Sequence, residues 1–286
     1  MTKPARTVVV ALSDTHAGHK LALMRPGVQL LDNSGPKPST WKPALTQMQR
    51  TVLWPHYKAC IKGVSELANG APIVLIHTGD LTWGTKYAQG LVSTRIADQL
   101  LIAVDNLEQW YALPNLQQVI LIEGTDSHEL GEATAPVMVA SELTRRCPKV
   151  GTRCAPHALV DCGGRRLDMT HHGPGAGRRV WLSGDELRRY VRNIVLDELL
   201  HGCEPPDVVM RAHIHDYLKE TVPVGGREYL GIVSPSFCGL TPFARQVMRS
   251  PGRLTVGLVA LEISDGKVAG VHPFVKTVDL RQVVKA

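Results

Sequence analysis

The sequence of 286 residues lacks several features that would place it in other classes of protein. No apolar run approaches the roughly 18 residues that a membrane-spanning helix needs, so we expect no membrane contact. The first residues lead into a short strand pattern without a small-residue cleavage site, which predicts no secretory signal. Internal repeats and linker-like stretches are also missing. These absences favour one globular domain over residues 1–286.

Paired cysteines are a further absence. The six cysteines are scattered and form no CxxC pair, a pattern typical of reduced thiols, and we expect a cytoplasmic protein. Cys147 and Cys154 are close enough in sequence to meet across a turn, so the sequence does not exclude a disulfide between them. The net charge of +6 favours anionic substrates.

The first half of the chain contains three apolar, β-branched runs that end in residues of the metal-binding type. The runs and the residues that follow them are 7–12 with Asp14 and His16, 72–76 with Asp80, and 119–122 with Asp126 and His128. Segments with helical spacing separate them, at 43–69 and 89–113. This alternation predicts a parallel sheet whose carboxyl ends carry the polar groups. A Pro-, Gly- and Ser-rich stretch at about 25–43 is predicted to be a loop insertion, either functional or merely solvated.

The second half has a different pattern, with two pairs of histidines after further expected strands. A hairpin at 158–170 precedes His171 and His172, and a strand at 207–210 precedes His213 and His215. Helices are expected at 135–146 and at 182–201, the latter with Ser183 as its N-cap. The remaining strand patterns, at 221–224, 228–233, 254–263 and 268–275, are expected to close a second, antiparallel sheet.

The order of these motifs resembles the calcineurin-like metallophosphoesterase superfamily. The sequence reads Asp-x-His at 14–16, Gly-Asp at 79–80, a variant of Gly-Asn-His at 124–128, His-Gly at 172–173 and His-x-His at 213–215. Each motif is short, but five of them occur in the family's order and each follows an expected strand. The resemblance covers residues 14 to 215. It implies an α/β fold, a four-layer αββα sandwich of two mixed β-sheets flanked by helices.

The resemblance also implies two divalent metal ions, with Mn²⁺ favoured over Fe²⁺, Zn²⁺ or Ni²⁺. The resemblance implies that Asp14, His16 and His215 of this chain hold one ion and that Asp80 bridges to the second ion. The second ion would be held by His213, by a histidine of the 171–172 pair and by a residue of the third motif. The family places its ligand directly before Gly, which favours His172 over His171; the other histidine is then expected to hydrogen-bond a ligand.

Three motifs depart from the family pattern, and the smallest change is Ala212, where the family's fifth motif commonly begins with Gly. The second motif continues to Trp83 where the family has another Asp. In the third motif Thr125 stands where the family has its Asn ligand. A hydroxyl is a poor ligand beside a carboxylate, so we expect Asp126 to bind the second ion and His128 to face the phosphate. Direct binding by Thr125 or His128 stays open.

The predicted function is a dinuclear-metal-dependent phosphoesterase in which a metal-activated water attacks phosphorus, with Asp80 and His128 as the catalytic residues. Arg178 and Arg179 follow the histidine pair. They are either solvated surface charge or a site for a substrate backbone, and the second reading favours a phosphodiester of nucleic acid or a nucleotide. His19 is either a substrate-binding residue or a solvated loop histidine. The rival functions are a phosphomonoesterase for a small metabolite or phosphoprotein, and a non-catalytic binding scaffold. The sequence indicates no oligomeric state.

Overall fold

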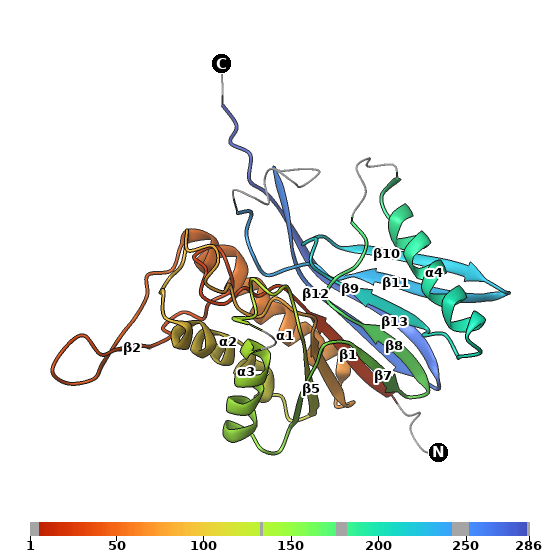
Figure 1. The fold of residues 1–286 in the computed structure, drawn as a ribbon, viewed down its shortest axis with the longest axis horizontal. Coiled ribbons are helices and arrows are strands. Elements are labelled where there is room, and N and C mark those ends of the chain that lie inside the picture. Colours follow the sequence, from red (N-terminus) through yellow and green to blue (C-terminus); the bar gives the residue numbers. More distant parts are fainter. Residues whose placement is uncertain (1–5, 132–133, 176–181, 242–251, 285–286) are drawn as a thin grey trace.

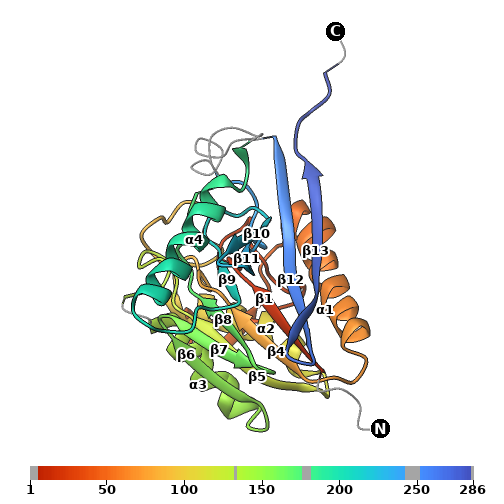
Figure 2. The same cartoon turned by 90° about the vertical axis from the view of Figure 1, so that its right-hand side faces the viewer.

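The computed structural model describes residues 6–131, 134–175, 182–241 and 252–284. Within these residues two β-sheets pack against each other, and helices cover the outer face of each sheet (Figures 1 and 2). The larger sheet has the strand order β13-β12-β1-β4-β5-β6, and the smaller sheet has the order β10-β11-β9-β8-β7. The predicted α/β sandwich is therefore confirmed.

The larger sheet is built around four parallel strands. They are β1 (Arg6–Leu12), β4 (Ile73–His77), β5 (Leu116–Ile122) and β6 (Gly151–Ala155). The helical segments that accompany this sheet are the π-helix η1 (Gln49–Leu53), α1 (Trp54–Ala68), α2 (Ile96–Tyr111) and α3 (Thr134–Arg146). In β1, Val8 and Val10 face the core under the helices, while Val9 and Ala11 face the smaller sheet. A strand buried on both faces needs this continuous apolar sequence.

The smaller sheet carries the second set of histidines. Its strands are β7 (Ala158–Cys162), β8 (Arg165–Met169), β9 (Val208–Arg211), β10 (Leu218–Val224) and β11 (Arg227–Val233). Helix α4 (Asp185–Leu200) covers its outer face through Leu187, Val191 and Val195 (Figure 1). Gly184, not Ser183, is the N-cap of α4, with a φ of 87° that favours glycine.

Several local expectations are corrected. The long strands β12 (Arg253–Ser264) and β13 (Lys267–Asp279) extend the larger sheet, because β12 pairs antiparallel with the free edge of β1. The 25–43 segment contains a short hairpin, β2 (Leu30–Asp32) and β3 (Ser39–Trp41), held by the buried side chain of Leu30.

All six cysteines are unpaired. Across the described ranges, no helix has the length and apolar character that crossing a membrane requires.

Candidate metal centre

The candidate ligands lie where strands of both sheets end. The larger sheet supplies Asp14 and His16 after β1 and Asp80 after β4, and the smaller sheet supplies histidines after β8 and β9. The two sets meet across the sheets. His215 Nε2 lies 3.0 Å from Asp14 Oδ1, and His171 Nε2 lies 3.2 Å from Asp80 Oδ2. The predicted convergence of strand ends therefore holds in the structure.

The backbone at these strand ends is left-handed. Asp14, His16, Asp80, His213 and His215 have φ values of 49°, 43°, 53°, 73° and 54°. They are five of the eight non-glycine residues with positive φ in the described part of the chain. Each such residue costs of order 1–3 kcal/mol of strain, and strain of this kind clusters at functional sites.

We define the enclosed group as Asp14, His16 and His215, whose ligand-type atoms all lie within 4.8 Å of one another. The Nε2 atoms of His16 and His215 face each other at 3.2 Å. Asp14 Oδ1 is buried, and although His215 Nε2 lies 3.0 Å away, the contact does not have the geometry of a hydrogen bond. Two imidazole nitrogens and a buried carboxylate oxygen that lie within 4.8 Å of one another form a donor set that fits a divalent cation.

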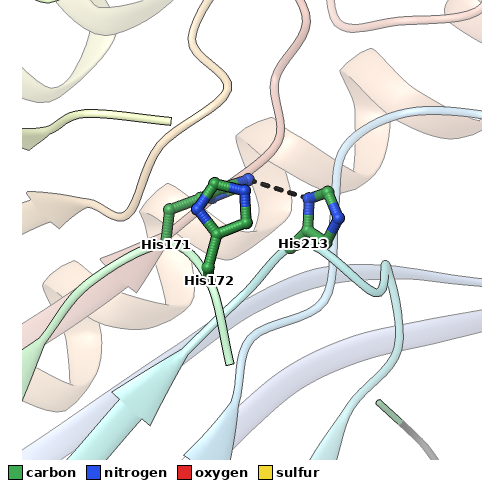
Figure 3. Close-up of side chains that lie close together, drawn as sticks. All are labelled: His171, His172 and His213. Carbon is green, nitrogen blue, oxygen red and sulfur yellow. Dashed lines mark hydrogen bonds between the residues drawn. The ribbon is translucent and has the colours of Figure 1, made fainter. Parts of the chain in front are cut away.

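We define the open group as His171, His172 and His213 (Figure 3). The Nε2 atom of His171 lies 3.2 Å from Nδ1 of His213. His171 is buried, and its Nδ1 lies 2.7 Å from the carbonyl oxygen of Thr78. Nδ1–H therefore donates to that carbonyl, and Nε2 is the ring atom that would bind a metal ion. His172 and His213 are exposed.

Asp80 connects the two groups. Its Oδ2 lies 3.2 Å from His171 Nε2 and 3.8 Å from His16 Nε2. Burial would raise the pKa of Asp80, but its hydrogen bond to His171 and the nearby histidine charges hold that pKa well below its usual value. Gly79 permits the arrangement, because a Cβ there would lie 2.4 Å from Nδ1 of His171.

The third-motif loop, residues 124–128, presents Thr125 rather than Asp126 to Asp80 and the open group. The hydroxyl of Thr125 lies 3.3 Å from His172 Nε2 and 3.4 Å from His213 Nδ1, and its N–H donates to Asp80 Oδ1 at 2.7 Å. Asp126 is exposed and belongs to none of the candidate ligand groups found among the described residues. The ligand role expected for Asp126 stays a prediction, without support from this geometry.

His128 lies beside the enclosed group. Its Nε2 is 3.9 Å from Asp80 Oδ2, and it forms a candidate ligand group with His16 and Asp80. Its Nδ1 is 2.6 Å from the carbonyl oxygen of Trp83, to which Nδ1–H donates. Trp83 thus orients His128 through its main-chain carbonyl.

Glu129 is a buried acidic residue that sequence reasoning missed. Its Oε1 accepts a 2.7 Å hydrogen bond from the N–H of Gly124, and its Oε2 has no partner. Burial raises the pKa of Glu129 to about 8. The only signal for Glu129 in the sequence is its position directly after His128. The local sequence pattern does not indicate that its side chain is buried.

The expected substrate-binding residues fall into two sets. His19 is buried and stacks on Trp83 with a centroid distance of 4.1 Å, so it is not a solvated loop histidine. Burial lowers its pKa to about 4. Arg178 and Arg179 lie outside the described residues. Among the nearby arginines of the sequence, Arg165 is paired with Asp207 at 2.6 Å.

Comparison with known proteins gives no family. No family model and no curated protein matches the chain. Among solved structures, it is similar to the sulfate thiohydrolase SoxB of Thermus thermophilus in complex with glycerol, at 13% identity and a TM-score of 0.38. That match covers 96% of this chain and 56% of the SoxB chain. A Thermotoga maritima protein solved by NMR matches at 13% identity and a TM-score of 0.30, over 60% of this chain and 87% of that one.

The class of protein is therefore defined by the geometry alone. The chain is an α/β sandwich whose strand ends gather histidine and aspartate side chains into groups that could hold divalent metal ions.

Proposed function

We propose that the chain is a dinuclear metal-dependent phosphoesterase whose two ions share Asp80. The observation that carries the proposal is the position of Asp80 between the enclosed group and the open group. A carboxylate with two oxygens suits a shared ligand, and mixed nitrogen and oxygen donors suit Mn²⁺ and related ions. The proposed ligands are Asp14, His16 and His215 for one ion, Asp80 for both, and His171, His213 and His172 with the third-motif loop for the other.

Two bound divalent ions would supply an activated water and neutralise the charge of a phosphate ester. The chain's own residues orient the reaction. Because His128 uses Nδ1–H to bond the Trp83 carbonyl, its Nε2 is the atom that holds or releases a proton toward a substrate oxygen. His172 and His213 are exposed, so the substrate would approach from the open group.

The proposed substrate is a phosphodiester of nucleic acid or a nucleotide. The net charge of +6 supports an anionic substrate. The preference for a diester depends on Arg178 and Arg179, since Arg165 and Arg188 are already engaged in ion pairs. The six scattered cysteines support a cytoplasmic location.

Metal analysis combined with hydrolysis assays tests the proposal. The purified chain would be loaded with Mn²⁺ and assayed on bis(p-nitrophenyl) phosphate and p-nitrophenyl phosphate, before and after chelation. We expect two ions per chain, faster hydrolysis of the diester and loss of activity with the chelator. A preference for the monoester would favour a phosphomonoesterase. An absence of both bound metal and hydrolysis would favour the binding scaffold.

A further inference from the structure

An aromatic cluster lies beside the candidate metal centre, on the segment that follows Asp80. The indole of Trp83 contacts the ring of His16 edge-on at a centroid distance of 5.3 Å, and it lies 5.1 Å from the ring of His128. His19 stacks on the same indole at 4.1 Å. Trp83 is 8% exposed, so it serves as a buried support rather than as a contact surface.

The loop that continues from Trp83 is fixed at its start. Gly84 and the buried side chain of Gln99 exchange two hydrogen bonds, of 2.9 and 3.0 Å. A Cβ at Gly84 would lie 2.0 Å from the carbonyl oxygen of Ser127, and the φ of Gly84 is +79°. Only glycine allows this close approach between the loop and the third-motif loop.

The same loop is fixed at its far end. The N–H of Lys20 donates to the carbonyl of Gly90 at 2.8 Å, and the N–H of Val92 donates to the carbonyl of Gly18 at 2.7 Å. The loop between these anchors is therefore held against the segment that carries His16.

Tyr87 lies in the middle of this anchored loop. The indole N–H of Trp83 donates to the Tyr87 carbonyl at 2.7 Å, which fixes the backbone there. Tyr87 is 51% exposed, and the centroid of its ring lies 6.5 Å from that of His128. The ammonium group of Lys86 lies 5.6 Å from the centre of the same ring. An aromatic face and a cation are thus offered to solvent next to the catalytic histidine.

We propose that Tyr87 and Lys86 form an aromatic subsite of the metal centre. The planar ring of the ester's organic group, a nucleobase or another aryl group, stacks on the phenol while the phosphate reaches the ligand groups. This inference rests on the proposed function and narrows its substrates to phosphate esters that carry an aromatic ring. Stacking is tolerant of the ring's identity because every such ring has a π face.

Phosphonates test the subsite because their C–P bond resists hydrolysis, so only binding is measured. The probes are adenosine 5′-methylenephosphonate, benzylphosphonate and propylphosphonate, titrated calorimetrically into the Mn²⁺-loaded full chain. In the wild type, the two aromatic probes should bind more tightly than propylphosphonate. Tyr87→Ala should raise the Kd of the aromatic probes by roughly 10-fold relative to that of propylphosphonate, the scale of one lost stacking contact.

Two variants serve as matched controls. Tyr87→Phe keeps the ring and should preserve the preference for aromatic probes. Trp41→Ala removes another exposed aromatic side chain, on strand β3, and should not change the ratio. If Tyr87→Ala raises the relative Kd of adenosine 5′-methylenephosphonate alone, the subsite binds a nucleobase. If it raises the relative Kd of both aromatic probes, the subsite accepts any aryl group.

An unchanged ratio in Tyr87→Ala, or binding of both aromatic probes by the wild type no tighter than that of propylphosphonate, would overturn the subsite. Failure of the wild type to hydrolyse bis(p-nitrophenyl) phosphate would instead contradict the proposed function, since the phosphonates report binding alone.

Discussion

The enclosed group and the open group use the same kinds of side chain in different surroundings. In the enclosed group Asp14 and His16 are buried, and the side chain of His215 is 16% exposed. In the open group only His171 is buried. Burial excludes competing water from the first set of ligands, whereas the second set can exchange with solvent. An ion in the enclosed group should therefore be held more tightly, and substrate should arrive at the open group.

Replacing the shared residue should have the largest effect, because it removes the feature that joins the two groups. Asp80→Asn should reduce the bound metal from two ions to at most one and lower kcat by roughly 10³-fold, the scale seen when one main electrostatic stabiliser is lost. Metal content by mass spectrometry and steady-state kinetics would measure both effects. Full activity with two ions still bound would contradict a shared Asp80.

Single ligand losses should separate the two groups. His16→Ala should weaken the tighter ion by more than about 100-fold, and His172→Ala should weaken the other ion by about 10-fold, because water can replace an exposed ligand. Competition with a chromogenic chelator would measure both affinities. Equal losses in the two variants would remove the distinction between an enclosed and an open group.

The third-motif loop gives a further test, because it carries both His128 and Asp126. His128→Ala should keep two ions and lower kcat by about 10²–10⁴-fold, as expected for a lost proton donor. Asp126→Asn is the matched variant, and its exposed carboxylate leads us to expect little change in either measurement. Loss of the second ion in Asp126→Asn would return Asp126 to the ligand role that the sequence predicts. Its loss in His128→Ala would make His128 a ligand.

The smallest expected effect concerns the buried acid of the same loop. Burial raises the pKa of Glu129 from 4.5 to about 8, so the folded chain holds a proton that the unfolded chain releases. The contribution of Glu129 to stability should therefore be lost as the pH rises from about 4.5 to 8. In the metal-free protein, Glu129→Gln should lose less unfolding free energy than the wild type between pH 6 and pH 9, measured by urea denaturation. Equal losses of unfolding free energy in Glu129→Gln and the wild type would contradict a buried, protonated Glu129.

The sequence predicted the strand ends well because their signal is local. Continuous β-branched runs such as 7–12 and 72–76 cannot be covered on one face only, so they indicated a sheet buried on both sides, with Asp14 and Asp80 at its edge. The pairing of β12 with β1 was not predictable in this way. It joins segments about 250 residues apart, as in the register of Arg6 with Ser264, and alternation alone does not show which sheet a strand enters.

Ring orientation was the part of the site that sequence reasoning could not supply. His171 and His172 are adjacent and chemically identical, and the carbonyl of Thr78 from another strand end decides which nitrogen of His171 faces Asp80 and His213. The exposure of Asp126 depends likewise on how the third-motif loop folds over Asp80, where the N–H and hydroxyl of Thr125 reach the cluster instead.

The enclosed group draws its members from opposite halves of the chain, since His16 and His215 stand 199 positions apart. An ion held between them would be a cross-link between the two sheets as well as a reagent. Closing so long a stretch of chain restricts the unfolded ensemble, so the ion would act on the sandwich as a disulfide acts on a secreted domain. Metal binding would then control the stability of the molecule together with its activity, and the metal-free protein would be less stable as well as inactive.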